Sequence, residues 1–216
     1  MAEAIFLSAG VPDPRRGPEF AATADTVAIT AAVSALAYVA LGRRRLIWGG
    51  HPAITPMIVV MSEGMSIDYA EWVTLYQSEF FKDEFPEDNK RFRNVVFTER
   101  LDNDREASLR LMRQRMFQEH EFRAAVFIGG MGGIIAEYEM FRQLQPDAKV
   151  IPVTSTGGAS LDVAAKLGEV PSDFQDQRDY VALFHDHLGI SVREERFRVP
   201  ADQPAAVEER FWRPAN

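Results

Sequence analysis

The stretch AAVFIGGMGGIIAEYEMF (residues 124–141) decides the fold. Its first part is rich in residues that favour β-strands, and its last part spaces apolar side chains as a helix does. Four of the five residues between them, 129–133, are glycine. Glycine adopts left-handed backbone conformations and, having no Cβ, lets a ligand approach the main chain. The stretch therefore predicts a strand, a tight turn and a helix, with room at the turn for a ligand.

Strands and helices alternate along the rest of the chain. Apolar runs rich in β-branched residues predict strands at residues 4–9, 45–48, 71–76, 94–98, 125–128 and 150–153. Periodic apolar positions predict helices at residues 24–41, 52–62, 104–120, 134–144, 159–167 and 174–188. This alternation indicates an α/β fold with a parallel sheet that helices cover on both faces.

Length and composition favour a single domain. A chain of 216 residues with 46% hydrophobic residues can bury one sizeable core, and we expect that domain to span residues 1–190. The charged stretch FFKDEFPEDNKRF (80–92) predicts a surface excursion between two strands. Residues 191–216 lose the alternation, so we expect a C-terminal tail, whose aromatic residues suggest that it packs on the domain.

Charge and cysteine content exclude several classes of protein. A net charge of −8 disfavours broad binding of nucleic acid, and the lone basic cluster GRRRLIW (42–48) suits a surface edge. Zero cysteines exclude disulfides, thiol catalysis and cysteine-ligated zinc. The chain shows no secretory signal pattern and no apolar run of membrane-spanning length, so we expect a soluble, cytoplasmic protein that does not bind membranes.

Small and hydroxyl residues gather where the predicted strands end. Ligands of parallel sheets bind at the carboxyl ends of the strands, so these residues are the candidate binding site. The candidates at these ends are Ser8, Gly10, Gly49, Gly50, Tyr76, Glu99, Gly129, Gly130, Gly132, Gly133, Thr154, Ser155, Thr156 and Gly157. Some of them have a structural alternative: Ser8 and Gly10 as a plain turn, Tyr76 as a half-buried core residue, and Glu99 as a solvated carboxylate.

The glycine turns favour a phosphate. A helix that begins straight after such a turn directs free N–H groups and the positive end of its dipole at the gap. Glycine runs at three strand ends support this reading, and the alternative is that each is only a tight turn. No run is followed by Lys-Ser or Lys-Thr, which disfavours an ordinary P-loop NTPase. Ile135 stands where a dinucleotide fingerprint needs a small residue.

Three segments carry a resemblance to a known superfamily. LIWGGHPAITPM (46–57) and FIGGMGGIIAEYE (127–139) are similar to the paired glycine elements of the SLOG superfamily, which includes the lonely-guy phosphoribohydrolases and Smf-like proteins. PVTSTGGAS (152–160) resembles the branch that accompanies TIR and sirtuin domains. The resemblance implies a Rossmann-like fold that binds or senses a nucleotide or ADP-ribose-like molecule in bacterial signalling or anti-phage defence. It also implies a homo-oligomer, with a TIR or sirtuin effector protein as a candidate partner.

The departures from the hydrolase pattern place binding ahead of catalysis. Gly133 replaces the threonine of that pattern, and the acidic residue comes one place late, at Glu137. In the hydrolases the glutamate works with an arginine of the preceding helix, and Arg113 is our candidate because it sits beside the apolar stripe of its helix. The resemblance implies that Arg113 and Glu137 bind a ribose phosphate or, alternatively, cleave a base from a nucleotide. Glu137 could also serve only to complement its helix dipole.

The histidines offer no clear site. His185 and His187 are two residues apart, so on a helix they point to different faces, and we expect no metal. His51 directly follows Gly50, and its role stays open between closing the turn and touching the ligand. We expect no cofactor. The apolar helix around residues 31–41 is either a subunit interface or core.

Overall fold

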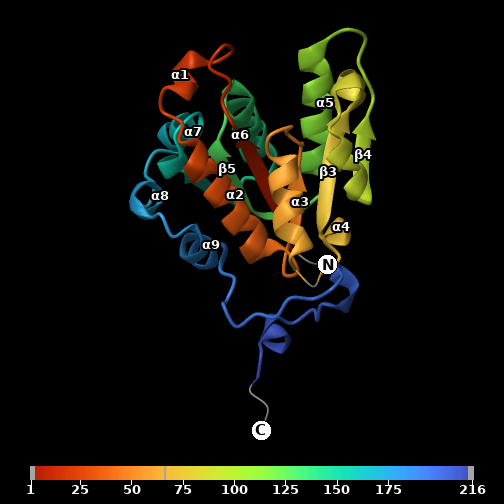
Figure 1. The fold of residues 1–216 in the computed structure, drawn as a ribbon, viewed down its shortest axis with the longest axis vertical. Coiled ribbons are helices and arrows are strands. Elements are labelled where there is room, and N and C mark those ends of the chain that lie inside the picture. The colour runs from red at the N-terminus through yellow and green to blue at the C-terminus, as the bar shows by residue number, and fades with distance from the viewer. Residues whose placement is uncertain (1–2, 66, 214–216) are drawn as a thin grey trace.

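A six-stranded, all-parallel sheet forms the centre of the computed structural model, which describes residues 3–65 and 67–213 (Figure 1). The strand order is β4-β3-β2-β1-β5-β6. The strands are β1 (Ala4–Gly10), β2 (Arg45–Trp48), β3 (Val73–Ser78), β4 (Asn94–Thr98), β5 (Phe122–Gly129) and β6 (Lys149–Val153). The prediction of a Rossmann-like α/β domain with a parallel sheet is confirmed.

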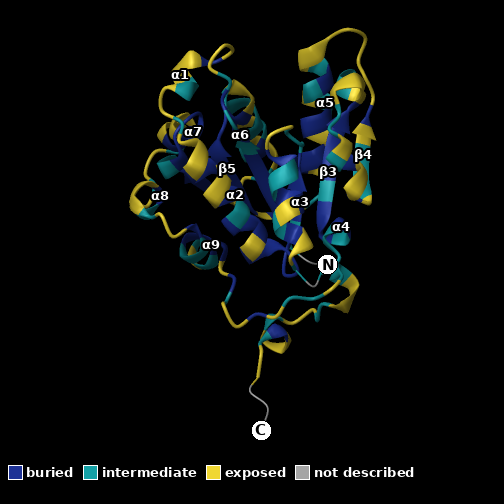
Figure 2. Ribbon diagram, in the orientation of Figure 1, coloured by how far each residue is buried: buried dark blue, intermediate teal, exposed yellow. Residues whose placement is uncertain are grey.

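Helices cover both faces of this sheet. They are α1 (Pro18–Ala21), α2 (Thr26–Ala40), α3 (Thr55–Glu63), α4 (Tyr69–Trp72), α5 (Arg105–Gln118), α6 (Gly132–Leu144), α7 (Ser160–Leu167), α8 (Asp173–Asp176) and α9 (Tyr180–Leu188). One core lies under α2, α3 and α9, and the other lies under α5, α6 and α7. β1 contributes side chains to both cores: Leu7 packs in the first core and Phe6 packs in the second. Figure 2 shows the central strands buried between these two helical layers, whereas the edge strand β4 is partly exposed.

Several predicted boundaries are wrong. β5 begins at Phe122 and not at residue 125, and α3 begins at Thr55 and not at residue 52. The strand expected at 71–76 begins at Val73, after the short helix α4, whose Trp72 is fully buried. The helix expected at 174–188 is divided into α8 and α9. At the break the side chain of Gln177 accepts hydrogen bonds from the amides of Arg178 and Asp179, and Asp179 caps α9. Such side-chain bonds to the main chain compete with a continuous helix.

The charged stretch between β3 and β4 forms two 3₁₀ helices, η1 (Glu79–Glu84) and η2 (Glu87–Arg91). Six of residues 80–92 are exposed and five are half-buried, which fits the predicted surface excursion. Phe92 and Asn89 are buried, and Asn89 donates a hydrogen bond to Gln77. The excursion is therefore tied to the end of β3.

Residues 191–213 pack beneath the amino ends of the strands, at the bottom of Figure 1. Glu194 of this segment is 1% exposed and forms an ion pair with Arg44, just before β2. Farther along, the carbonyl of Phe197 accepts a hydrogen bond from Trp72 Nε1. The segment thus lies at the opposite end of the sheet from the carboxyl ends of the strands.

Among the helices of residues 3–65 and 67–213, none is long and apolar enough to cross a membrane.

Candidate functional site

The paired carboxyl ends of β1 and β5 mark the switch point of the sheet, and we call this place the β1–β5 crevice. The chain leaves β1 for α2 on one face of the sheet and leaves β5 for α6 on the other face. Parallel sheets bind ligands where the connections of neighbouring strands depart to opposite faces. Here the two strand ends stay joined, because Gly10 pairs with Gly129. The topology therefore directs attention to the β1–β5 crevice and to the residues that surround it.

Ser8, Arg113 and Glu137 meet beside this crevice. The Ser8 hydroxyl, at the end of β1, donates a 2.5 Å hydrogen bond to Glu137 Oε2 on α6. Arg113 on α5 places Nε 3.5 Å from Glu137 Oε1 and Nη2 3.4 Å from the carbonyl oxygen of Gly133. The structure thus brings together three of the predicted residues, from a strand and two helices.

Burial makes this group of charges significant. The Arg113 and Glu137 side chains are only 8% and 17% exposed. Each charge is therefore partly desolvated and compensated mainly by the other, through a contact at the long limit of a hydrogen bond. A guanidinium retains N–H donors for phosphate, and a carboxylate retains lone pairs for ribose hydroxyls. The pair can therefore bind a group that carries both.

The beginning of α6 is open toward this pair. Met131 is the N-cap residue, and no side chain of the described residues caps the helix, although the first amides of a helix lack partners within it. A Cβ on Gly132 would meet nothing within 4 Å, and one on Gly133 would lie 3.5 Å from Arg113 Nη2. The α6 N-terminus thus offers amides, a positive dipole end and free space, the combination that binds anions.

Gly129 and Gly130, unlike Gly132, pack closely against other parts of the protein and leave no space for a ligand at their Cβ positions. Gly130 donates a 2.7 Å hydrogen bond from its N–H to the carbonyl of Gly10, which joins β5 to β1. Its φ is +74°, and a Cβ there would lie 1.9 Å from the Cδ1 atom of Ile134. Gly129 also has positive φ, and a Cβ on it would lie 2.5 Å from Ile29 Cδ1. These two glycines are required by the turn itself.

The turn after β6 interlocks with the turn after β5. The Thr156 hydroxyl is fully buried, accepts a 2.9 Å hydrogen bond from Gly129 N and donates to the carbonyl of Val153. Gly157 has positive φ, and a Cβ there would lie 1.9 Å from the carbonyl oxygen of Thr23. Ser155 shares a 3.1 Å hydrogen bond with the hydroxyl of Tyr180, and Thr154 is half-buried at the start of the turn.

The turn after β2 is held by a residue to which sequence reasoning assigned no structural role. Gln77 on β3 donates a 2.9 Å hydrogen bond from Nε2 to the carbonyl of Gly49. Gly50 has φ +72°, and a Cβ on it would lie 2.2 Å from the same nitrogen. The packing of Gln77 against this turn depends on a contact between two strands, which no local pattern signals.

Tyr76 lies in the core, away from the crevice. It is 1% exposed, and its hydroxyl contacts Glu119 Oε2 at 2.6 Å and His120 Nε2 at 2.9 Å. Burial, with the hydrogen bond to Glu119, raises the pKa of Tyr76. The side chain therefore fits the structural alternative of a core residue.

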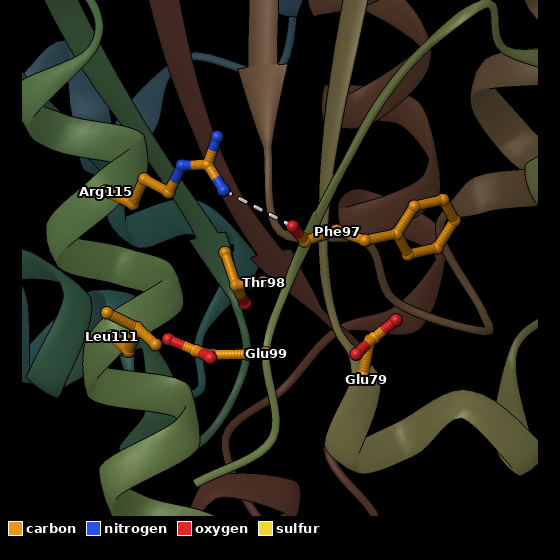
Figure 3. Close-up of a pocket in the computed structure, with 6 residues that line it drawn as sticks. All are labelled: Glu79, Phe97, Thr98, Glu99, Leu111 and Arg115. Atoms are coloured by element: carbon orange, nitrogen blue, oxygen red, sulfur yellow. Dashed lines mark hydrogen bonds between the residues drawn. The ribbon is translucent and has the colours of Figure 1, made fainter.

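Glu99 lines a separate hollow of about 320 Å³ between α5 and the end of β4 (Figure 3). In that view Glu99 points toward Leu111, while the ring of Phe97 points away. Arg115 reaches the carbonyl of Phe97 at 3.4 Å, and Thr98 is buried beneath. Because Ser8, Arg113 and Glu137 do not line this hollow, we do not include Glu99 in the candidate site.

The segment before α2 reaches the same end of the sheet. A Cβ on Gly17 would lie 3.1 Å from Met131 Sδ, so this segment packs against the residue that precedes α6. Gly158 N donates to the hydroxyl of Thr23 at 3.1 Å. No sequence motif marks these contacts, because they join segments more than a hundred residues apart.

The two histidines of α9, His185 and His187, contact groups of the protein outside the candidate site. His185 Nδ1 contacts the carbonyl of Ile190, and His187 lies between Asp173 and Lys149. Among the side chains that the structure describes, no three His, Asp or Glu residues are grouped as metal ligands would be.

Comparison with known families accounts for this arrangement. A family model described as the SLOG cluster3 family matches residues 19–188, well over half of the chain. The chain belongs to the SLOG cluster3 family. The SLOG resemblance of the glycine elements is thereby confirmed, and membership is consistent with a nucleotide-related small molecule as ligand. Comparison of this SLOG domain with curated proteins returned no match, and neither did comparison with solved structures.

Proposed function

We propose that this SLOG domain binds or senses a nucleotide or an ADP-ribose-like molecule in the β1–β5 crevice. In this proposal the amides of Gly132 and Gly133 bind a phosphate, Arg113 adds a charge-assisted contact to it, and Glu137 accepts hydrogen bonds from the ribose. Gly10, Gly49 and the β6 turn shape the crevice around these groups.

The main support for this proposal is the contact of Glu137 with both Ser8 and Arg113. These contacts lie beside the N-terminus of α6, which no described side chain caps. A carboxylate that only complements its helix dipole needs neither a strand-end hydroxyl nor an arginine from another helix. Here both partners are present, and the space above Gly132 is open. An oriented acid, a buried guanidinium and free amides suit a ligand that combines phosphate with hydroxyls.

A second candidate function is hydrolysis of the N-glycosidic bond of a nucleoside monophosphate or related nucleotide. The observation that favours it is the fixed orientation of Glu137, whose Oε2 is held by Ser8 at 2.5 Å. A carboxylate held in this way can orient a water molecule or stabilise the positive charge that develops on the ribose as the base departs. In that case Glu137 and Arg113 are catalytic.

A panel of nucleotides separates these functions. Purified protein is incubated with AMP, ADP, NAD, ADP-ribose and cyclic ADP-ribose, and thermal stability and free base are measured on the same samples. A binding domain raises its melting temperature without base release, because a ligand that binds only the folded state stabilises it. A hydrolase releases base, and Glu137→Gln abolishes the release. No stabilisation and no release with any compound would contradict both functions.

We also propose a biological role and a set of protein partners for this domain. SLOG membership supports a role in bacterial signalling or anti-phage defence, in which a homo-oligomer in the cytoplasm acts with a separate TIR or sirtuin effector. Light scattering during size-exclusion chromatography tests the oligomer, and a monomer at all concentrations would contradict it. Co-purification with a TIR or sirtuin protein encoded beside this chain tests the partner, with the nucleotide that binds present in the buffer.

A further inference from the structure

His51 lies over the end of β1, next to the β5 turn. A Cβ on Gly10 would lie 3.4 Å from His51 Nε2 and 3.4 Å from the Cα atom of Gly130. The Nε2 edge of the imidazole therefore lies beside Gly10, on the side of that residue where Gly130 is also close. The ring comes from the turn after β2, so it reaches sideways across the neighbouring strand.

The protein fixes which nitrogen of this ring carries the proton. The amide of Ala53 donates a 3.2 Å hydrogen bond to His51 Nδ1, so Nδ1 is the acceptor and the neutral ring carries its proton on Nε2. The carbonyl of His51 accepts hydrogen bonds from the amides of Ile54 and Thr55, which anchors the residue at the start of α3. Burial, with a smaller contribution from the Arg16 guanidinium, lowers the pKa of His51 and favours this neutral form.

The Nε2 atom lies beside Gly10 at the end of β1, and no described residue forms a hydrogen bond with it. In the described part of the chain, the ring makes its hydrogen bond only through Nδ1. An N–H donor beside the positive charge of Arg16 suits an anionic oxygen and repels a cation. The turn that would receive this oxygen adjoins the α6 N-terminus, which also favours an anion.

We propose that His51 is a ligand-contacting residue that donates a hydrogen bond from Nε2–H to a phosphate oxygen in the β1–β5 crevice. The proposal rests on the proposed function for the choice of a nucleotide. It assigns His51 a binding role and gives Ala53 N–H the positioning role that selects the tautomer.

The first test is nitrogen NMR of ¹⁵N-histidine-labelled protein, with the His51 signals assigned from the spectrum of His51→Gln. We expect the neutral Nε2–H tautomer at pH 7, and a shift of that N–H signal when AMP or inorganic pyrophosphate is added. An Nδ1–H tautomer or an imidazolium at pH 7 would overturn the proposal. So would an Nε2–H signal that moves with neither probe. Pyrophosphate keeps this test decisive even if every nucleotide fails to bind and the proposed function falls.

The second test compares AMP with adenosine in binding titrations of three proteins. His51→Phe retains a ring without the donor, and His51→Gln retains an N–H near the Nε2 position. Since a hydrogen bond to a charged group contributes a factor of roughly 10 to 100 in affinity, we expect His51→Phe to weaken AMP by about that factor. Adenosine should be unaffected, and His51→Gln should recover most of the loss. Equal AMP affinity in wild type and folded His51→Phe would refute the contact.

Discussion

The hydroxyl of Ser8 donates a hydrogen bond to Glu137 across 129 residues of chain, at a donor–acceptor distance of 2.5 Å. The bond joins the end of the central strand to the second turn of α6. One carboxylate oxygen is thereby held in place, while the other faces Arg113. Groups that are oriented before the ligand arrives lose less entropy on binding, so this contact prepares the site.

Removing the hydroxyl should therefore weaken ligand binding without unfolding the protein. In Ser8→Ala the Glu137 carboxylate is free to rotate, and we expect affinity for the best nucleotide of the panel to fall about tenfold, the value of roughly one hydrogen bond to a charged group. Ser34→Ala on α2 removes a hydroxyl outside the site and serves as the control. Titrations of Ser8→Ala, Glu137→Gln and the double variant should show coupling, and fully additive effects would contradict it.

Gly132 and Gly130 should respond to alanine in opposite ways. Gly132 has open space around it and begins α6, so Gly132→Ala should fold normally but place a methyl group against the ligand. Gly130 combines φ +74° with a Cβ position 1.9 Å from Ile134 Cδ1. Gly130→Ala should therefore lower the free energy of unfolding by roughly 1–3 kcal/mol or more, through strain and overpacking.

Urea unfolding and ligand titration of both glycine variants provide the check. Gly64→Ala at the end of α3 is the control, since its φ is −76° and the nearest contact of a Cβ would be 4.0 Å away. Unchanged affinity in Gly132→Ala would show that the ligand does not approach the α6 N-terminus.

The buried ion pair beneath the sheet should make the C-terminal segment essential for stability. Glu194→Ala leaves Arg44, itself 1% exposed, without its main counterion. Loss of one partner of a buried pair costs about 3–5 kcal/mol. Glu195→Ala changes the exposed neighbour and should cost almost nothing. Chemical denaturation measures both, and equal stability of the two variants would show that residues 191–213 are a dispensable tail.

Acid should destabilise the fold partly through His120. Burial is the main cause of its lowered pKa, so between the folded value and the unfolded value of about 6.5 only the unfolded chain binds the proton. The contribution of His120 to the free energy of unfolding is therefore fully present above a pH of about 6.5. It is lost as the pH falls from that value through the lower pKa of the folded state. His120→Gln should flatten the dependence of unfolding free energy on pH between roughly 7.5 and 5.5. An identical slope in wild type and variant would contradict this.

The elements of the fold were predictable because their signals are local. Residues 124–141 carry strand, turn and helix preferences in a short window, and β5, its turn and α6 form where those preferences indicate. The break between α8 and α9 was missed because Gln177 competes for main-chain amides, and apolar periodicity does not report that competition.

The candidate site was predictable only in part. The meeting of Arg113 with Glu137 follows from helix spacing together with the SLOG resemblance. The role of each glycine does not, because it depends on which atom fills the place of the absent Cβ. For Gly157 that atom is the carbonyl oxygen of Thr23, which a sequence pattern does not reveal. Several glycines that suggested a phosphate site therefore hold the turns together, and Gly132 remains the open one.

Calorimetric titration of AMP and ADP-ribose into wild type, Glu137→Gln and Glu139→Gln shows whether the ligand binds at Ser8, Arg113 and Glu137. Glu139 lies on the same helix but pairs with Lys166 at the surface, so its variant controls for the loss of a carboxylate. We expect Glu137→Gln to weaken binding of the preferred nucleotide at least about tenfold, because it removes a charged acceptor, and Glu139→Gln to bind like wild type. Equal affinities in all three proteins would place the ligand away from Ser8, Arg113 and Glu137 and would contradict the proposed site.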